Sequence, residues 1–428
     1  MNVTTTPAPV SSRALAATLH FLPFLLVPAS ANNLSNLVSV CTFIGCFSLT
    51  YKGAGPAVLR VVLFIIAAYF GHPLVTADHE VPHRMVSTGI AFSGALMLLK
   101  ALDVCVISLW DQEPPHWLRN GKRVPLPDTL FGRLVYSFDL LTTNRGSSWF
   151  DGYSWDWAPK YIALYSPPVR SRMSNTMRSL AYFVYLYLVM DVLETLTQSE
   201  NWNIHQPHPI LSLSIPEQLF YSFAICLITF VGIILSHRIF STIAVALGNT
   251  PKAWVPVLRD PFASSSLQDF WSNRWHHSFK RPVERFVIPI MMLVPQRWPW
   301  STRRVIRAFL IFGFQTIFHL YLVSRCFHGR KSEMVWSFVD QSTLLFFLLQ
   351  PIGLLIEREL LVPLSKALLP ASPNARTWVT RAWVWGWLLW TGRYWADVWV
   401  RSGMWNPGEG YLAWSPVRGV LFGKWFLI

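Results

Sequence analysis

The sequence predicts an all-α fold that crosses a membrane many times. Hydrophobic residues make up 52% of the 428 residues and charged residues only 14%, whereas a soluble globular protein carries about 25% charged residues. Several apolar runs also approach the roughly 20 residues that a helix needs to cross a bilayer. We therefore predict a polytopic integral membrane protein with about 8–10 transmembrane helices.

The predicted spans follow one another along the chain, each on a run of apolar residues. The first run is treated as a retained span and not as a secretory signal, because no strongly basic segment precedes it and equally apolar runs follow. The run FVIPIMMLVP at 286–295 is too short to cross and is predicted to be re-entrant. The spans lie near residues 13–30, 34–50, 57–72, 86–109, 179–198, 218–247, 304–325, 335–356 and 377–400.

Four parts are predicted along the chain. Residues 1–12 (MNVTTTPAPVSS) form a short disordered leader, and residues 13–110 form an N-terminal transmembrane block. Residues 111–178 form a cytosolic loop rich in Trp, Pro and Arg. Residues 179–428 form a second transmembrane block, which holds the polar motifs.

The basic balance of the chain predicts which loops face the cytosol. A net charge of +14 in a polytopic protein favours a membrane surface over nucleic acid as the partner. Between Trp110 and Arg178 nine Lys or Arg stand against six acids, and between 250 and 285 six stand against three, whereas 199–217 has no Lys or Arg. Since basic loops stay in the cytosol, we place the N-terminus and both basic loops there. Arg325 and the basic residues after it disagree with this topology.

Five cysteines are scattered through the apolar runs, with no CxxC pair and no disulfide pattern. We interpret them as buried packing residues and not as metal ligands. They are Cys41, Cys46, Cys105, Cys226 and Cys326.

His319 stands well inside the span at 304–325. About fifteen residues precede it, which places it roughly 20 Å along the helix. Ionisable side chains at that depth are costly and mark a pathway or a reaction site. Gln315, four residues earlier, shares its face and could bond one ring nitrogen or line the same cavity. Two interpretations stay open, a general base or a neutral histidine bonded to a neighbouring helix.

The stretch SLQDFWSNRWHHSFKRPVERF at 266–286 concentrates polar residues beside an apolar segment. Zinc binding by His276 and His277 is disfavoured, because adjacent histidines diverge by about 100° on a helix and no third ligand has suitable spacing. An amphipathic interfacial helix explains the Trp, Lys and Arg residues but explains Asp269, Asn273 and the histidines poorly. A cationic rim beside a polar entrance suits a phosphate-bearing cosubstrate such as a coenzyme A thioester. The rim residues are Arg274, Lys280, Arg281 and Arg285.

Three motifs together resemble the wax-synthase-like branch of the membrane-bound O-acyltransferases, particularly its fungal members. The first motif is a W-x-P…P…SLxDFWxxRWH pattern, formed by Trp254, Pro256, Pro261, Ser266, Leu267, Asp269, Phe270, Trp271, Arg274, Trp275 and His276. The second motif is FDLLTTNRGSSW at 138–149. The third is His319, which stands in an apolar helix about forty residues after the first motif.

The resemblance implies an intramembrane reaction chamber in which His319 assists attack of an alcohol on an acyl-CoA thioester. It implies a multi-pass protein, which we place in the endoplasmic reticulum, with a lipophilic alcohol, acyl-CoA and the bilayer as partners and no tightly bound cofactor or metal. Fungal members of the branch commonly acetylate terpenoid or meroterpenoid secondary metabolites, which suggests acetyl-CoA. His276 or Asn273 is expected to contact the developing oxyanion. Gln315, Trp271 and Trp275 are assigned to substrate binding.

Three other functions compete with acetyl transfer. A long-chain wax-ester or sterol-ester synthase would use the same chemistry on a longer donor. A transporter could use membrane His, Asp and Glu as a proton relay, but the chain shows no repeated halves. A magnesium-dependent prenyltransferase would need clustered carboxylates, and no DDxxD-like group is present.

Overall fold

A computed structural model of the chain describes most of the residues. The described residues are 35–76, 84–150, 152–163, 165, 171–197, 209–275, 279–326, 339–369, 372–403, 412 and 414–426. The predicted leader at 1–12, the first predicted span at 13–30 and the histidine pair at 276–277 lie outside them.

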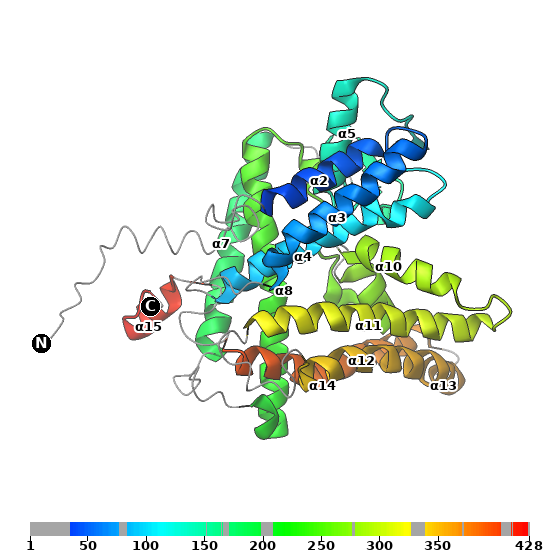
Figure 1. The fold of residues 1–428 in the computed structure, drawn as a ribbon. Coiled ribbons are helices and arrows are strands. Elements are labelled where there is room, and N and C mark those ends of the chain that lie inside the picture. Colours follow the sequence, from blue (N-terminus) through cyan, green and yellow to red (C-terminus); the bar gives the residue numbers. More distant parts are fainter. Residues whose placement is uncertain are drawn as a thin grey trace, which may run out of the picture.

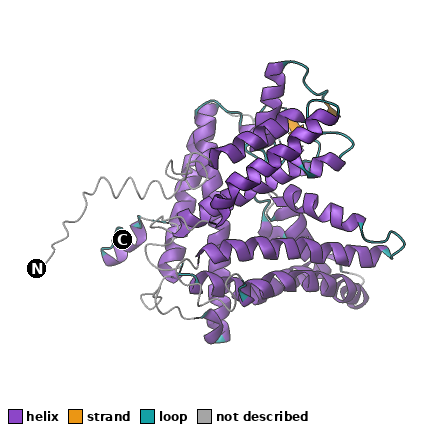
Figure 2. Cartoon of the chain, viewed as in Figure 1, coloured by secondary structure: helices purple, strands orange, loops and turns teal. Residues whose placement is uncertain are grey.

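Helices dominate the described chain (Figure 2). The α-helices are α2 (Ser35–Ser48), α3 (Ala54–Thr76), α4 (Arg84–Cys105), α5 (Leu130–Thr142), α6 (Lys160–Ala163), α7 (Arg172–Thr197), α8 (Ile215–Ala246), α9 (Leu267–Asp269), α10 (Lys280–Met292), α11 (Trp300–Cys326), α12 (Gln341–Ile356), α13 (Val362–Leu368), α14 (Pro373–Arg401) and α15 (Pro416–Phe422). Two π-helical turns, η5 (Phe270–Arg274) and η8 (Glu357–Leu361), interrupt this series.

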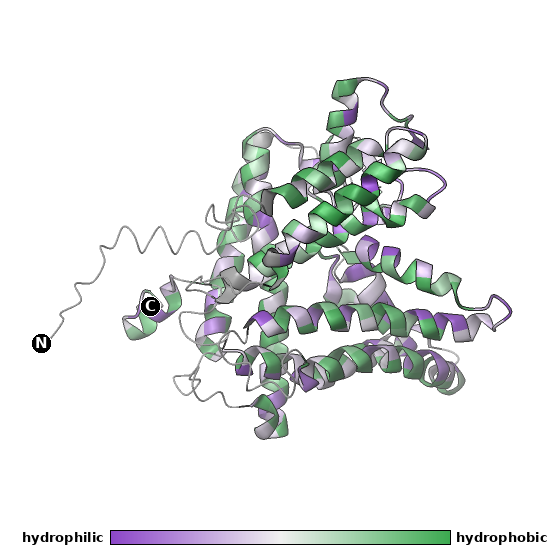
Figure 3. Cartoon of the chain, in the orientation of Figure 1, coloured by the Kyte–Doolittle hydropathy of each residue, from purple (hydrophilic) through white to green (hydrophobic). Residues whose placement is uncertain are grey.

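Five of these helices are long and apolar enough to cross a bilayer, which confirms an all-α polytopic membrane fold. They are the candidate spans Ala54–His72, Thr88–Trp110, Met173–Thr197, Ile215–Ala246 and Trp300–Arg325. Figure 3 shows the apolar surface of α3 and the hydrophilic residues in the first turns of α11. The predicted span at 34–50 coincides with the shorter helix α2, and the described part of the span at 335–356 contains α12. The span at 377–400 lies within the Trp-rich helix α14.

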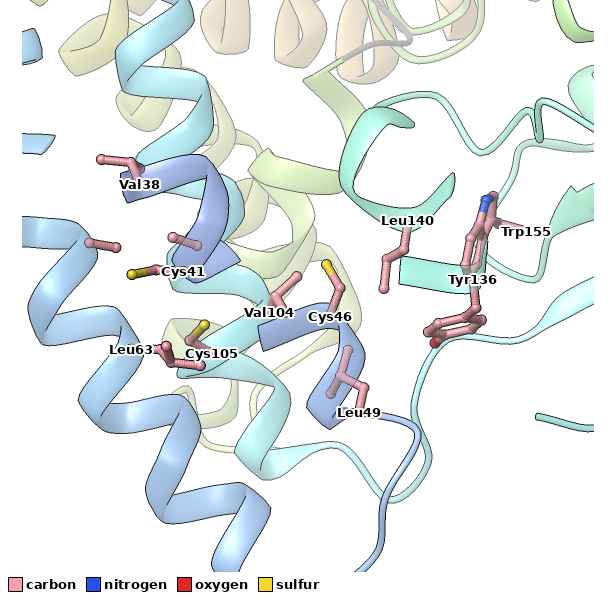
Figure 4. Close-up of a cluster of buried hydrophobic side chains, with 12 residues drawn as sticks. Val38, Cys41, Cys46, Leu49, Leu63, Val104, Cys105, Tyr136, Leu140 and Trp155 are labelled. Carbon is pink, nitrogen blue, oxygen red and sulfur yellow. The ribbon is translucent and has the colours of Figure 1, made fainter. Parts of the chain in front are cut away.

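The N-terminal block packs α2, α3 and α4 against one another and against α5 of the following loop. Its core is a buried cluster that includes Cys46 and Cys105 from the helices and Tyr136 and Trp155 from the loop (Figure 4). Because these thiols are surrounded by apolar side chains, they pack as predicted from the sequence. The loop is therefore anchored on the transmembrane block by its own aromatic residues.

A small sheet stands on this loop, which the all-α prediction did not include. Strands β1 (Trp117–Arg119), β2 (Lys122–Arg123) and β3 (Tyr153–Trp155) pair antiparallel in the order β2-β1-β3. Asn120 and Gly121 both have positive φ, which suits the two-residue hairpin turn between β1 and β2.

The second block has two groups of helices at a steep angle to each other (Figure 1). The helices α7 and α8 pack together, and α8 also contacts α14. The helices α11, α12 and α14 lie side by side in that order, with α10 against α11. Contacts of α4 with α10 and α11 join the two blocks.

The polar stretch at 266–286 is not one helix. A short turn, α9, leads into η5, after which Trp275 takes an extended backbone conformation and α10 begins at Lys280. The segment predicted to be re-entrant forms the end of α10, a helix of 13 residues and hence about 20 Å long. It is too short to cross a bilayer.

Candidate active site

A cavity of about 1150 Å³ lies among the helices of the second block. Its walls come from α8, α10, α11, α12 and α14, together with the 261–280 segment. Such a volume exceeds that of most single-ligand sites, which run from about 300 to 1,000 Å³. His319, Gln315, Trp271, Trp275 and Lys280 of the predicted site residues line it.

The His319 ring has one nitrogen bonded and one available. Its Nδ1 lies 2.7 Å from the backbone carbonyl oxygen of Gln315, one helical turn earlier. A carbonyl oxygen only accepts hydrogen bonds, so Nδ1 carries the proton and Nε2 holds the lone pair. This is the tautomer that a general base requires. Gln315 thus orients the ring through its backbone, while its side chain lines the cavity.

Aromatic rings surround the imidazole. The ring centroid of Phe347 lies 4.2 Å from that of His319, and the centroid of Trp395 lies 5.5 Å away. Phe318 contacts the imidazole from its own helix at 5.8 Å. Aromatic rings attract a nearby cation through their negative faces. An imidazolium that forms when His319 takes a proton therefore has favourable neighbours.

The DFW motif is held against the cavity by a buried carboxylate. The backbone N–H of Leu267 donates to Glu357 in η8 at 2.7 Å, and the Ser266 hydroxyl accepts from the N–H of Asp269. Burial raises the pKa of Glu357, although the backbone donors of the motif partly offset this effect. This contact joins η8 to α9, the short turn that leads into η5, and π-turns are frequent at functional sites.

Trp271 carries a buried indole N–H next to the cavity. Its ring lines the cavity and packs 5.6 Å from Phe312 and 6.4 Å from Phe346. Its Nε1 is buried and has no hydrogen-bond partner among the described residues. Five other buried indole nitrogens of the described residues also lack a partner, so Trp271 is distinguished by its place in the cavity lining.

Asn273 lies away from the cavity lining. It is exposed, and its side-chain amide donates to Asp269 at 3.1 Å. Arg274 donates to the same carboxylate at 2.6 Å and to the carbonyl oxygen of Asp260 at 2.9 Å. Burial raises the pKa of Asp269, but these hydrogen bonds outweigh it and hold the pKa below its ordinary value. The structure therefore gives both residues contacts that shape the 259–274 loop.

Two cations of the predicted rim are paired with Asp103 of the N-terminal block and Asp111 at the start of the following loop. Asp103 of α4 accepts from Arg281 at 2.8 Å and from Arg285 at 2.5 Å, and Asp111 accepts from Arg285 at 2.7 Å. These two arginines and Lys280 also line a smaller pocket of about 200 Å³, which includes Arg145. Lys280 faces both pockets.

Besides Lys280, the large cavity is lined by four cations that the sequence analysis did not single out. Arg307 lies 3.6 Å from Glu284, and Arg358 pairs with Glu359. Arg303 and Arg304 pair with no carboxylate among the described residues, and Arg303 Nε is buried without a partner there. The spacing RR-x-x-R at the start of an apolar helix was the available signal. The cavity-lining cations are Lys280, Arg303, Arg304, Arg307 and Arg358.

The NRGSSW motif fastens the loop at 111–178 to the WVPV segment. The Arg145 guanidinium donates to the carbonyl oxygens of Val255 and Pro256, and the Trp149 ring packs 5.5 Å from that of Trp254. Two motifs that are more than a hundred residues apart therefore form one structural unit beside the site.

Residues 254–349 match a sequence model of the membrane bound O-acyl transferase family. This range contains the DFW motif, α10, His319 and the first half of α12. The family resemblance expected from the sequence is thus confirmed over the segment that builds most of the cavity. No solved structure matches the chain significantly.

Two curated relatives come from fungi. "Acetyltransferase ataH" of Aspergillus terreus is 29% identical over 125 residues, which are 28% of this chain and 38% of that protein. "Acetyltransferase spyB" of Aspergillus fumigatus is 22% identical over 367 residues, which are 81% of this chain and 56% of that protein. The chain therefore spans 38% and 56% of the lengths of these relatives.

Proposed function

We propose that this chain, whose residues 254–349 carry the sequence of the membrane bound O-acyl transferase family, is a membrane O-acetyltransferase. Its donor is acetyl-CoA and its acceptor is a hydroxyl of a lipophilic terpenoid or meroterpenoid. One observation carries the proposal: a histidine with an available Nε2 lies at one end of a cavity whose other end is cationic. The names of the two fungal relatives support acetyl as the transferred group.

His319 acts as the general base of a direct transfer. Its Nε2 takes the proton of the acceptor hydroxyl while the oxygen attacks the thioester carbonyl carbon. The new C–O bond forms, the C–S bond breaks, and the imidazolium returns the proton to the sulfur of coenzyme A. Phe347 and Trp395 stabilise the transient imidazolium through their ring faces.

Trp271 supplies a donor to the thioester oxygen. Negative charge develops on this oxygen as the tetrahedral intermediate forms, and a fixed N–H aimed at it lowers the barrier. The orphan Nε1 of Trp271 fits this role better than the exposed amide of Asn273. His276 lies outside the described residues and stays a sequence-based prediction for the same contact.

The phosphates of the donor lie at the cationic end of the cavity. His319 stands 12 to 16 residues beyond Arg307 and Arg303, which corresponds to about 18–24 Å along α11. About a dozen bonds separate the sulfur of coenzyme A from its pyrophosphate, an extended length of roughly 16 Å, and an arginine side chain adds about 6 Å. The donor can therefore span the cavity from Arg303 and Arg304 to His319. Of the four residues of the predicted rim, Lys280 lines this cavity and stays assigned to phosphate binding.

We use the name apolar arm for the part of the cavity lining that is formed by Phe223 and Phe230 of α8, Phe262, and Trp385 of α14. The acceptor packs against these side chains. Apolar walls with few polar groups suit a lipophilic ring system, which enters from the bilayer.

The base is tested with purified protein in proteoliposomes, radiolabelled acetyl-CoA, and farnesol and ergosterol as probe alcohols. We expect His319→Ala to lose at least about 100-fold in ester formation while it binds acetyl-CoA as tightly as the wild type. Normal turnover of a folded His319→Ala protein would refute the assignment of His319 as the general base. A wild-type protein that binds no acetyl-CoA at millimolar concentration would overturn the acyltransferase assignment itself.

The phosphate site is tested with the double variant Arg303→Gln/Arg304→Gln. Charge-assisted hydrogen bonds are worth about 1.5–3 kcal/mol each, so the KM for acetyl-CoA should rise at least about 10-fold and kcat should change little. Arg376→Gln is the matched control, because Arg376 lies in the first turn of α14 and does not line the cavity. Equal KM values in the double variant and the control would contradict the site.

The same assays separate the competing functions. A wax-ester or sterol-ester synthase would prefer palmitoyl-CoA to acetyl-CoA. A transporter would move label across the membrane without consuming the thioester.

A further inference from the structure

The cavity has a closed end at the level of His319. Along α11 its lining stops at His319, along α12 it starts at Phe346, and along α14 it stops at Trp395. The ring centroids of Phe346 and Trp395 are 5.6 Å apart, and those of Phe347 and Trp395 are 5.8 Å apart. These are contact distances for aromatic pairs, so no alkyl chain passes between the rings. We call Phe346, Phe347 and Trp395 the aromatic floor.

Close packing continues directly behind the floor. Val323, one turn beyond His319, packs against Val398 in a buried cluster. An ion network follows, in which Arg401 donates to Asp340 at 2.5 Å and to Asp397 at 2.7 Å. An alkyl chain that entered this region would desolvate buried charges, which is strongly unfavourable. Among the described residues, the floor is thus backed by packed side chains and an ion network.

Given the proposed function, the floor faces the acyl group of the donor. The attacking oxygen must lie within hydrogen-bond reach of His319 Nε2 and about 3–3.5 Å from the carbonyl carbon. With the phosphates at Arg303 and Arg304, the pantetheine arm fills the length of α11, and the acyl chain continues toward the floor. A long chain would have to turn into the apolar arm, which the acceptor occupies.

We propose that the aromatic floor restricts the donor to short acyl groups and that Phe346 is its specificity-determining residue. Phe346 lines the cavity and is 8% exposed. Its ring contacts are with Phe347, Trp395 and Trp271, so it can be shortened without removing a ring that touches His319. The change Phe346→Ala opens room for roughly three or four methylenes.

The experiment measures kcat/KM with acetyl-, butyryl-, hexanoyl- and octanoyl-CoA in the proteoliposome assay, and the dissociation constant of each donor by calorimetry. One methylene too many in a filled pocket costs about 10- to 200-fold, so the wild type should prefer acetyl- to hexanoyl-CoA by at least 10-fold in both quantities. Phe346→Ala should reduce this preference at least about 10-fold, and Phe346→Leu, a smaller packing change, should shift it in the same direction. Phe309→Ala is the matched control, since Phe309 is 39% exposed and does not line the cavity.

The outcomes separate the two proposals. A wild type that binds and uses octanoyl-CoA as well as acetyl-CoA would overturn the floor and leave acyl transfer intact. An unchanged preference in both folded Phe346 variants would also overturn it. A wild type that binds none of the four donors would overturn the proposed function and, with it, this inference.

Discussion

The substitution Asp103→Asn tests the contact that joins the two transmembrane blocks. The Asp103 carboxylate of α4 accepts from both Arg281 and Arg285 of α10, and its side chain is only 4% exposed. The two arginines are 11% and 15% exposed. Removal of the negative charge therefore leaves two buried guanidiniums facing a neutral amide.

The expected loss follows from this burial. Breaking a buried ion pair by removing one partner costs about 3–5 kcal/mol, because the remaining charge stays desolvated. Asparagine keeps one acceptor oxygen and Arg285 keeps its bond to Asp111, so we expect the lower end, about 3 kcal/mol. At roughly 2–4 °C per kcal/mol for a unit of 150–250 residues, such as the N-terminal block with its loop, the melting temperature of that unit should fall by about 6–12 °C.

The N-terminal block contains a reporter for the measurement. Cys46 and Cys105 are fully buried in its core, so a thiol-reactive fluorescent dye labels them only when this block opens. Melting of detergent-solubilised wild type and variant with such a dye gives the shift directly.

Glu113→Gln is the control for Asp103→Asn. Glu113 forms an ion pair with Arg123 in which both side chains are more than half exposed. Such surface pairs contribute about 0–1 kcal/mol to the free energy of unfolding. A variant Asp103→Asn that melts within about 2 °C of the wild type would refute the reasoning, because the buried pair would then be worth no more than this surface pair.

Two further predictions concern the packing behind the DFW motif. A Cβ added at Gly353 would lie 2.4 Å from Trp387 Nε1, so Gly353→Ala should lower the free energy of unfolding by about 1–3 kcal/mol in the dye assay. Gly386→Ala is its control, because Gly386 has open space around it, and this variant should keep the stability of the wild type. Glu357→Ala removes the acceptor of the Leu267 N–H and should cost about 1–3 kcal/mol and lower kcat, whereas Glu357→Gln keeps an acceptor and should lose less than half as much. Equal melting temperatures within either pair of variants would contradict the packing described.

The polytopic helical fold was predictable because it depends on local composition. A run of apolar residues long enough to cross a bilayer must satisfy its own backbone hydrogen bonds there, and a helix does so within the run. The same counting placed His319 within an apolar helix, whereas its tautomer is assigned from the structure, in which Nδ1 lies 2.7 Å from the backbone oxygen of Gln315. Boundaries that depend on tertiary contacts were less predictable, such as the break between η5 and α10.

The role of each cation was not predictable, because charge pairing depends on which helices face each other. Arg281 and Arg285 resemble a phosphate rim in the sequence, but their partner Asp103 lies 178 and 182 residues away. Arg303 and Arg304 resemble ordinary flanking charges, and only the packing of α11 against α10 and α12 turns them toward the cavity.

The sequence by itself determined the membrane class, the helical fold and the presence of a histidine within an apolar helix, because each depends on residue types at short spacing. The tertiary structure decided which charges are neutralised, which residues line the cavity and where the cavity ends. These features depend on contacts between helices distant in sequence, since Phe346, Trp395 and His319 meet only when α11, α12 and α14 pack side by side.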